Sequence, residues 1–213
     1  MRYRSLLYVS VAAGAVYFLT QRWQPFPGSA VLKGIPVGAL AVLALGSRGL
    51  RRDAGVLALG LAFSTAGDVL LDLNPAFFVF GLCAFLLAHF SYIALFVRNR
   101  AAGIRLDPPR LAAVLLILAY SATLSAWIVP SVGELAVPVV FYICAITAMV
   151  CTAIIARFPQ PWVAVGAVLF LISDSLLAIH KFKTPVPLRD YLVWITYYLG
   201  QCGIALGYLK SVP

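Results

Sequence analysis

Long runs of apolar residues, separated by short polar stretches, make up most of this sequence. A helix needs about 20 mostly apolar residues to cross the roughly 30 Å hydrocarbon layer of a membrane. The recurring runs predict spanning helices over residues 6–20, 31–47, 54–72, 75–97, 111–129, 134–157, 160–180 and 190–209. We therefore predict an all-α membrane protein, a bundle of about eight transmembrane helices, with residues 1–213 forming a single integral membrane domain.

The breaks between the runs contain residues that end helices. Proline has no backbone N–H and disfavours helix in the residue before it. Prolines stand in the breaks at Pro25, Pro75, Pro108, Pro130 and Pro185. The first run is short and follows a basic start, as in a signal peptide. Because Leu19-Thr-Gln-Arg-Trp23 contains no small-residue cleavage pattern, we predict a membrane span there as well.

Composition and charge agree with a membrane location. Hydrophobic residues make up 63% of the chain and charged residues 11%, whereas about 25% of residues are charged in a soluble domain. With eight spans, the side of the N-terminus holds Arg2, Arg4, Arg48, Arg51, Arg52, Arg98, Arg100, Arg105, Arg110, Arg157 and Lys210. The opposite side holds only Arg22, Lys33, Lys181, Lys183 and Arg189.

Lys and Arg are retained on the cytoplasmic side of membrane proteins. This bias predicts cytoplasmic termini at both ends, in the inner membrane of a bacterium. Anionic inner-leaflet lipid accounts for the net charge of +9, so no nucleic-acid partner is required.

Three aspartates, Asp68, Asp72 and Asp174, fall in predicted spans, where an ionisable group costs on the order of 3 kcal/mol. Asp68 and Asp174 each follow a small residue and precede one variable residue and Leu-Leu. Each also falls in the third helix of a four-helix half. We therefore consider an ancient duplication into two parallel four-helix repeats. In that arrangement the two carboxyl groups lie at similar depth and face each other across the bundle.

Other polar residues predict a funnel that opens on the outer side and narrows towards the bilayer centre. Its members are Asp72, Lys33 at the start of the second span, His89 and Tyr92 in the fourth, His180, Lys181 and Lys183 at the end of the seventh, and Tyr198 and Gln201 in the eighth. Structural alternatives remain open. Asp68 and Lys33 can form an ion pair between two helices, His89 can be a hydrogen-bonded core residue, and the tyrosines can form an interfacial belt.

Four motifs occur in order along the chain: Gly67-Asp68-Val-Leu-Leu, Phe80-Gly81-xxx-Phe85-xxx-His89-xx-Tyr92, Ser173-Asp174-Ser-Leu-Leu-Ala178 and Tyr197-Tyr198-Leu-Gly-Gln201. Together with Lys33 before Pro36, this series resembles the YhhN-type lysoplasmalogenase family over residues 30 to 207. The resemblance implies a membrane hydrolase that cleaves the vinyl ether bond of lysoplasmalogens. The products would be a fatty aldehyde and glycerophosphoethanolamine or glycerophosphocholine.

This chemistry suits a pair of carboxyl groups. One protonated carboxyl protonates the β-carbon of the vinyl ether, and a second group orients or deprotonates water. Burial favours the protonated form of a carboxyl, and a nearby carboxylate favours it further. We predict Asp68, Asp174 and His89 as catalytic residues. The predicted substrate-binding residues are Lys33, Tyr92, Lys181, Tyr198 and Gln201.

The mechanism requires no cofactor and no metal, although a metal-dependent lipid hydrolase remains an alternative. The main rival is a transporter or lipid-binding protein that uses the buried aspartates for proton or cation coupling. A structural scaffold is a third possibility. The expected partners are a lysophospholipid substrate and the surrounding membrane lipid. The sequence leaves the head group, the identity of the acidic aspartate and the oligomeric state open.

Overall fold

The computed structural model describes residues 2–100, 107–156 and 158–211. Within these ranges the chain is helical and contains no strand. The α-helices are α1 (Arg2–Thr20), α2 (Ser29–Gly46), α3 (Ala54–Leu73), α4 (Phe78–Arg98), α5 (Pro108–Ile128), α6 (Ala136–Ile155), α7 (Trp162–Phe182) and α8 (Arg189–Ser211). The all-α class is confirmed. Arg105, Arg157 and the predicted end of the sixth span at residue 157 lie outside the described residues.

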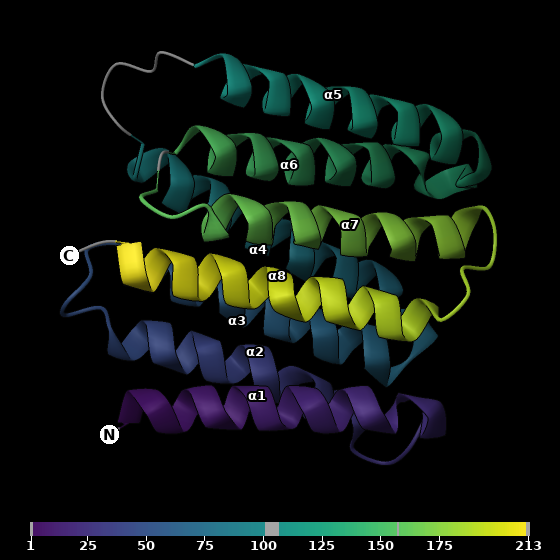
Figure 1. Ribbon diagram of the computed structural model, residues 1–213. Coiled ribbons are helices and arrows are strands. Elements are labelled where there is room, and N and C mark those ends of the chain that lie inside the picture. Colours follow the sequence, from purple (N-terminus) through teal and green to yellow (C-terminus); the bar gives the residue numbers. More distant parts are fainter. Residues whose placement is uncertain (1, 101–106, 157, 212–213) are drawn as a thin grey trace. The chain divides into compact units, whose positions relative to one another are not determined.

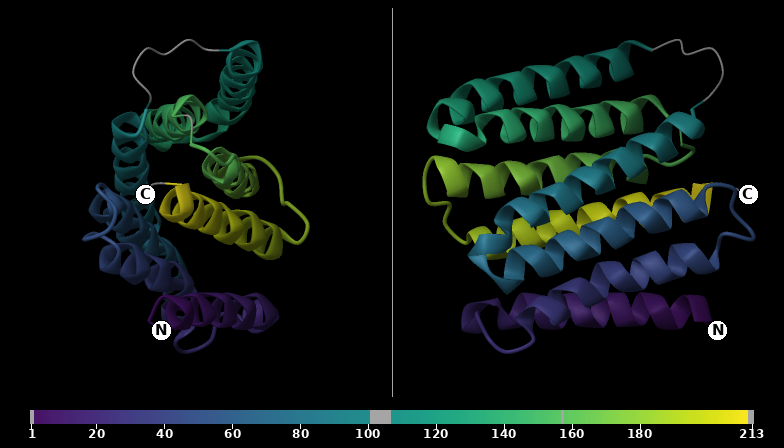
Figure 2. Two further views of the ribbon diagram at one scale, coloured as in Figure 1. Left: turned by 60° about the vertical axis from the view of Figure 1, so that its left-hand side comes forward. Right: turned by 180° about the vertical axis from the view of Figure 1, so that it is seen from behind.

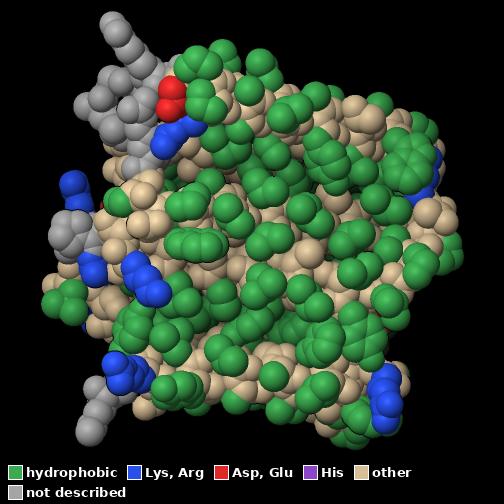
Figure 3. All heavy atoms as spheres, viewed as in Figure 1, with side chains coloured by type: hydrophobic (Ala, Val, Ile, Leu, Met, Phe, Trp, Pro, Cys, Tyr) green, Lys and Arg blue, Asp and Glu red, His purple; other side chains and the backbone are tan. Residues whose placement is uncertain are grey.

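Among the described helices, seven, α2 to α8, are long and apolar enough to cross a membrane. The shaft of α1 is apolar too, but it begins at Arg2 rather than at residue 6, and its polar first turn lowers its mean hydropathy. In Figure 3, hydrophobic side chains cover the helix shafts and Lys and Arg side chains lie towards the helix ends. These features define an integral, multi-pass membrane protein.

The chain divides into two compact units. The first comprises the residues up to Leu95 together with the end of α8 from Tyr208, and the second comprises Phe96–Gly207. In the first unit α1 packs on α2 and α2 on α3; in the second, α5 packs on α6 and α6 on α7 (Figures 1 and 2). Each unit is thus built mainly from four consecutive helices, the division that the duplication hypothesis expects.

In the first unit, glycines bring aromatic rings of α4 against the backbone of α3. A Cβ atom on Gly60 would lie 2.6 Å from the ring of Tyr92, and one on Gly67 would lie 2.6 Å from the ring of Phe85. Small residues allow such close approach of helices in a membrane, where packing is a major source of helix association. These two contacts fix the register in which α3 runs antiparallel to α4.

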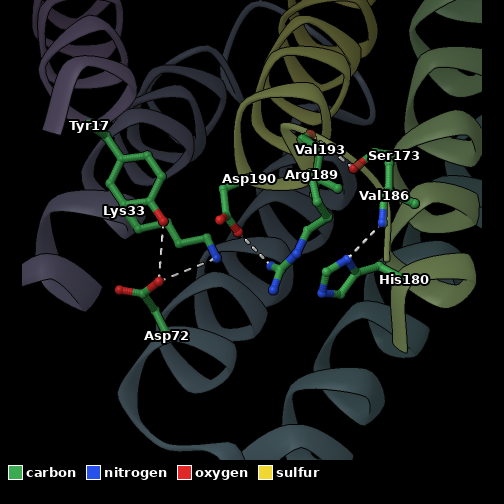
Figure 4. A network of polar contacts seen from close by, with 9 residues as sticks. All are labelled: Tyr17, Lys33, Asp72, Ser173, His180, Val186, Arg189, Asp190 and Val193. Carbon is green, nitrogen blue, oxygen red and sulfur yellow. Dashed lines mark hydrogen bonds and ion pairs between the residues drawn. The ribbon is translucent and has the colours of Figure 1, made fainter. Parts of the chain in front are cut away.

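In the second unit, α7 and α8 meet backbone to backbone. A Cβ atom on Gly166 would lie 2.6 Å from the carbonyl oxygen of Gly200 and 2.7 Å from the amide nitrogen of Ile204. Further along the pair, the Ser173 hydroxyl donates a 3.1 Å hydrogen bond to the carbonyl oxygen of Val193 (Figure 4). The register therefore places Ser173 and Asp174 beside the first turns of α8.

Candidate active site

Asp68 lies on α3 and is buried, with 2% of its surface exposed. One turn earlier on the same face, the hydroxyl oxygen of Ser64 lies 3.5 Å from that of Tyr92 on α4. This contact directs the polar face of α3 towards α4. A carboxyl group at this depth is costly, so its place on the polar face favours a functional role.

His89 and Tyr92 lie on α4, and both are fully buried. Tyr92 packs on Gly60, and the ring of Phe85 packs on Gly67. His89 lies between these two contacts on α4, and Asp68 lies one residue beyond Gly67 on α3. In this antiparallel register, with a rise of about 1.5 Å per residue, Asp68 and His89 are offset by about 7.5 Å along the α3–α4 axis. The first unit therefore gathers a carboxyl group, an imidazole and a phenol in its interior.

At the helix ends of the same unit, Lys33 forms its ion pair with Asp72, at 3.7 Å from Nζ to Oδ1. The Tyr17 hydroxyl of α1 donates a 3.1 Å hydrogen bond to the same oxygen (Figure 4). Lys33 therefore pairs with the aspartate nearer the helix end, one turn beyond Asp68. Tyr17 was not predicted as a site residue.

In the second unit, Asp174 is half-buried on α7. Its Oδ2 accepts a 2.5 Å hydrogen bond from the Tyr142 hydroxyl, which projects from α6. Charge-assisted hydrogen bonds of this kind are short and roughly twice as strong as neutral ones. Tyr142 therefore holds the Asp174 carboxyl in one orientation. Tyr142 was not predicted as a site residue, although its hydroxyl lies within an apolar stretch of α6.

Tyr198 and Gln201 lie on α8 in the same unit. The Tyr198 ring stacks on Trp194, with centroids 5.6 Å apart and planes 6° apart, and Gln201 is fully buried. Gln201 follows Gly200, which meets Gly166, whereas Asp174 lies two turns further along α7. That separation corresponds to about 12 Å along the axis. The α7–α8 register thus keeps Gln201 well away from Asp174.

The basic residues at the end of α7 differ in their roles. Lys183 donates to the Ser131 hydroxyl at 2.5 Å and lies over the ring of Trp127. His180 accepts a 3.1 Å hydrogen bond on Nδ1 from the Val186 N–H, which closes the turn after the helix (Figure 4). Lys183 therefore stabilises the connection between α5 and α6, and His180 stabilises the one between α7 and α8. The exposed Lys181 is the remaining candidate for a phosphate contact from this helix.

Among the described residues, no group of three or more His, Cys, Asp and Glu side chains is arranged to hold a metal ion. The four cysteines are Cys83, Cys144, Cys151 and Cys202, and none of them forms a disulfide. The candidate site residues themselves supply carboxyl, imidazole and phenol groups.

The fold and the buried polar residues define a multi-pass, all-α membrane protein with an acidic side chain in one span of each compact unit. Residues 28–208 match the family model of the YhhN family. The chain belongs to this family, which confirms the resemblance found in its motifs.

The curated relatives include proteins named lysoplasmalogenase. The chain is 38% identical to the one from Mycobacterium tuberculosis, over 87% of this chain and 74% of the relative. It is 30% identical to the lysoplasmalogenase TMEM86A of Bos taurus and 29% identical to that of Homo sapiens, each over 93% of this chain and 86% of the relative. No solved structure matches this chain.

Proposed function

We propose that this chain is a lysoplasmalogenase, a membrane hydrolase that cleaves the vinyl ether bond of a lysoplasmalogen. Membership of the YhhN family and the names of the curated relatives support the activity. The observation that carries the proposal is an acidic side chain within one span of each compact unit, Asp68 in α3 and Asp174 in α7. Acid–base hydrolysis of an ether needs two such groups, one to donate a proton and one to orient or deprotonate water.

The reaction adds one water molecule across the carbon–carbon double bond and then breaks a carbon–oxygen bond. A protonated carboxyl delivers its proton to the β-carbon, which leaves an oxocarbenium ion at the carbon attached to oxygen. A carboxylate then takes a proton from water as the water oxygen adds to that carbon. The resulting hemiacetal collapses to a fatty aldehyde and a glycerol hydroxyl. Buried carboxylates also stabilise the cationic intermediate electrostatically.

In this proposal Asp68 and Asp174 are the acid–base pair. His89, offset from Asp68 by about 7.5 Å along the packed α3–α4 pair, takes part in proton transfer with them. Tyr92 and Tyr198 position substrate or water. Gln201 lies about two turns from Asp174, deeper along the α7–α8 pair, and contacts a part of the substrate further from the vinyl ether. Lys33 and Lys181 lie at helix ends, suited to meet the phosphate. The substrate enters from the outer side of a bacterial inner membrane, with both termini of the chain in the cytoplasm.

The test is to incubate the purified protein with lysoplasmenylethanolamine and to follow aldehyde through coupled NADH-dependent reduction. We expect aldehyde and glycerophosphoethanolamine in equal amounts from detergent-solubilised protein. A transporter would instead show substrate movement only in sealed vesicles. Well-folded protein that binds lysolipid yet releases no aldehyde would overturn the proposed activity.

Tyr142 gives a prediction about positioning. Replacing Tyr142 by Phe removes the 2.5 Å hydrogen bond to Asp174 and keeps the aromatic ring at this position of α6. Hydrogen bonds to charged groups contribute about 1.5–3 kcal/mol, so we expect kcat to fall about tenfold or more with KM little changed. Steady-state aldehyde release measures both constants.

The matched control is Tyr120→Phe, which makes the same change on the exposed surface of α5. It should leave kcat within about twofold of the unmodified protein, because surface substitutions usually have small effects. Equal losses in the two variants, or a change in KM alone for Tyr142→Phe, would contradict the positioning role.

A further inference from the structure

A compact polar cluster lies where three helices of the first unit end on the same side. Tyr17 is in the last turn of α1, Lys33 in the second turn of α2 and Asp72 in the last turn of α3 (Figure 4). The ends of α1 and α3 and the start of α2 correspond to the proposed outer interface of the membrane. A lipid head group lies at this level, above its hydrocarbon chain.

Tyr17 and Lys33 contact the same one of the two Asp72 oxygens. The Tyr17 hydroxyl donates to Oδ1 at 3.1 Å, and the Lys33 ammonium lies 3.7 Å from the same atom. A separation of 3.7 Å exceeds a normal hydrogen bond. Lys33 is therefore attracted to the carboxylate while its N–H groups stay available to a second acceptor. The Lys33 side chain is 20% exposed, so a second acceptor can reach its ammonium group from outside the protein.

The other oxygen, Oδ2, is buried, and no donor among the described residues forms a hydrogen bond with it. A buried carboxylate oxygen without a donor is costly. The side chain as a whole is 12% exposed, at the edge of the cluster. A small rotation of the carboxylate would bring Oδ2 to a donor that arrives from the interface.

We propose that Lys33 and Asp72 form a head-group subsite that selects phosphoethanolamine. The proposal rests on the proposed function and names its preferred substrate class. Lys33 binds the phosphate, and Asp72 Oδ2 accepts a hydrogen bond from the ethanolamine ammonium. Binding then replaces the Lys33–Asp72 ion pair by two new pairs, Lys33 with the phosphate and Asp72 with the ammonium. Tyr17 holds Asp72 in place through Oδ1.

The subsite discriminates because the two common head groups differ in their donors. An ethanolamine ammonium has N–H groups, like the three of a lysine side chain, whereas the trimethylammonium group of choline has none. Choline is recognised best by several aromatic faces around the cation. In this cluster Tyr17 supplies the ring contact, 5.9 Å from the Lys33 ammonium. A carboxylate acceptor with a single ring favours ethanolamine.

The experiment compares binding of 1-alkyl-lysophosphoethanolamine and 1-alkyl-lysophosphocholine, whose saturated ether bonds this reaction does not cleave. Tryptophan fluorescence titration of the detergent-solubilised protein gives each Kd. We expect the unmodified protein to bind the ethanolamine lipid about tenfold more tightly, as one charge-assisted hydrogen bond would give. Asp72→Asn should weaken ethanolamine binding to the choline level and change choline binding less than about twofold.

Lys33→Gln provides a second, independent variant. Since both lipids carry a phosphate, it should weaken binding of both by similar factors. Asp190→Asn is the matched control, because Asp190 is an exposed aspartate paired with Arg189; it should change neither Kd. Equal affinities for the two lipids in the unmodified protein, or equal losses for both in Asp72→Asn, would overturn the subsite.

Aldehyde release from lysoplasmenylethanolamine is measured on the same preparations. A tenfold ethanolamine preference without aldehyde would refute the proposed hydrolysis and leave the head-group subsite standing. Aldehyde release without any head-group preference would refute the subsite and leave the hydrolase standing.

Discussion

Asp68→Asn and Asp174→Asn should each reduce aldehyde release by about 10³-fold. Positioned acids and bases contribute typically 10²–10⁴-fold to a rate. Asparagine has nearly the shape of aspartate but can neither deliver a proton to the β-carbon nor accept one from water. In Asp174→Asn the amide oxygen can still accept the Tyr142 hydrogen bond, so the local packing is retained. Aldehyde release at saturating substrate gives the loss in kcat.

The double variant makes this prediction sharper. Residues that act on one reaction as a unit show strongly non-additive losses. We therefore expect the double variant to be about as inactive as either single variant. Asp107→Asn serves as the control, because Asp107 precedes α5, pairs with Arg110 and is about half exposed. A single variant that folds and keeps more than about a tenth of the activity would remove that aspartate from the acid–base pair.

The helices could be predicted because apolar runs of spanning length have few alternative structures in a membrane. Asp68 and Asp174 stand out in the sequence for the related reason that a charge inside a span is expensive. Their partners could not be predicted in the same way. Tyrosine is common in membrane proteins as an interfacial residue, so neither Tyr17 nor Tyr142 carries a distinctive signal.

Which tyrosine meets which aspartate depends on helix rotation and register. In the second unit, Gly166 and Gly200 fix how α7 slides along α8. That register decides that Asp174 lies beside the first turns of α8 while Gln201 lies two turns away. The two motifs that contain Asp174 and Gln201 do not specify this distance, because neither motif describes how one helix packs against the next.

Lys33 illustrates the same limit within one unit. The sequence placed it within reach of an aspartate at the outer end of α3, and two aspartates one turn apart were available. The structure pairs Lys33 with Asp72. The choice follows from the register of α2 against α3, in which Gly34 lies against Val69, and a difference of one turn, about 5.4 Å, separates the two possibilities. Sequence reasoning at the level of spans does not resolve that distance.

The duplication hypothesis gains a structural parallel. Gly60 and Gly166 occupy matching places in α3 and α7, eight residues before Asp68 and Asp174 respectively. Each brings its helix against the helix that follows it, α4 or α8. The two halves nevertheless use the contact differently, since Gly60 accommodates the Tyr92 ring and Gly166 accommodates the backbone of α8. The repeat itself remains a prediction.

The contact at Gly166 leads to a stability prediction. In Gly166→Ala, the new Cβ would lie 2.6 Å from the Gly200 oxygen and 2.7 Å from the Ile204 nitrogen. Both are backbone atoms, so no side-chain rotation relieves the overlap and α8 has to move. Overpacking costs typically about 1–3 kcal/mol, and we expect the upper part of that range. The midpoint of thermal unfolding in detergent should fall by about 5 °C or more.

Gly55→Ala is the matched control, because Gly55 lies in the first turn of α3 with no heavy atom within 4 Å of the added Cβ. Alanine is the better helix former by about 0.5–1 kcal/mol in a helix interior, so Gly55→Ala should unfold at the same temperature or slightly above. Aldehyde release should fall in Gly166→Ala alone, since α8 carries Tyr198 and Gln201. If both variants unfolded at the unmodified temperature, the close α7–α8 contact would be wrong, and with it the register that separates Gln201 from Asp174.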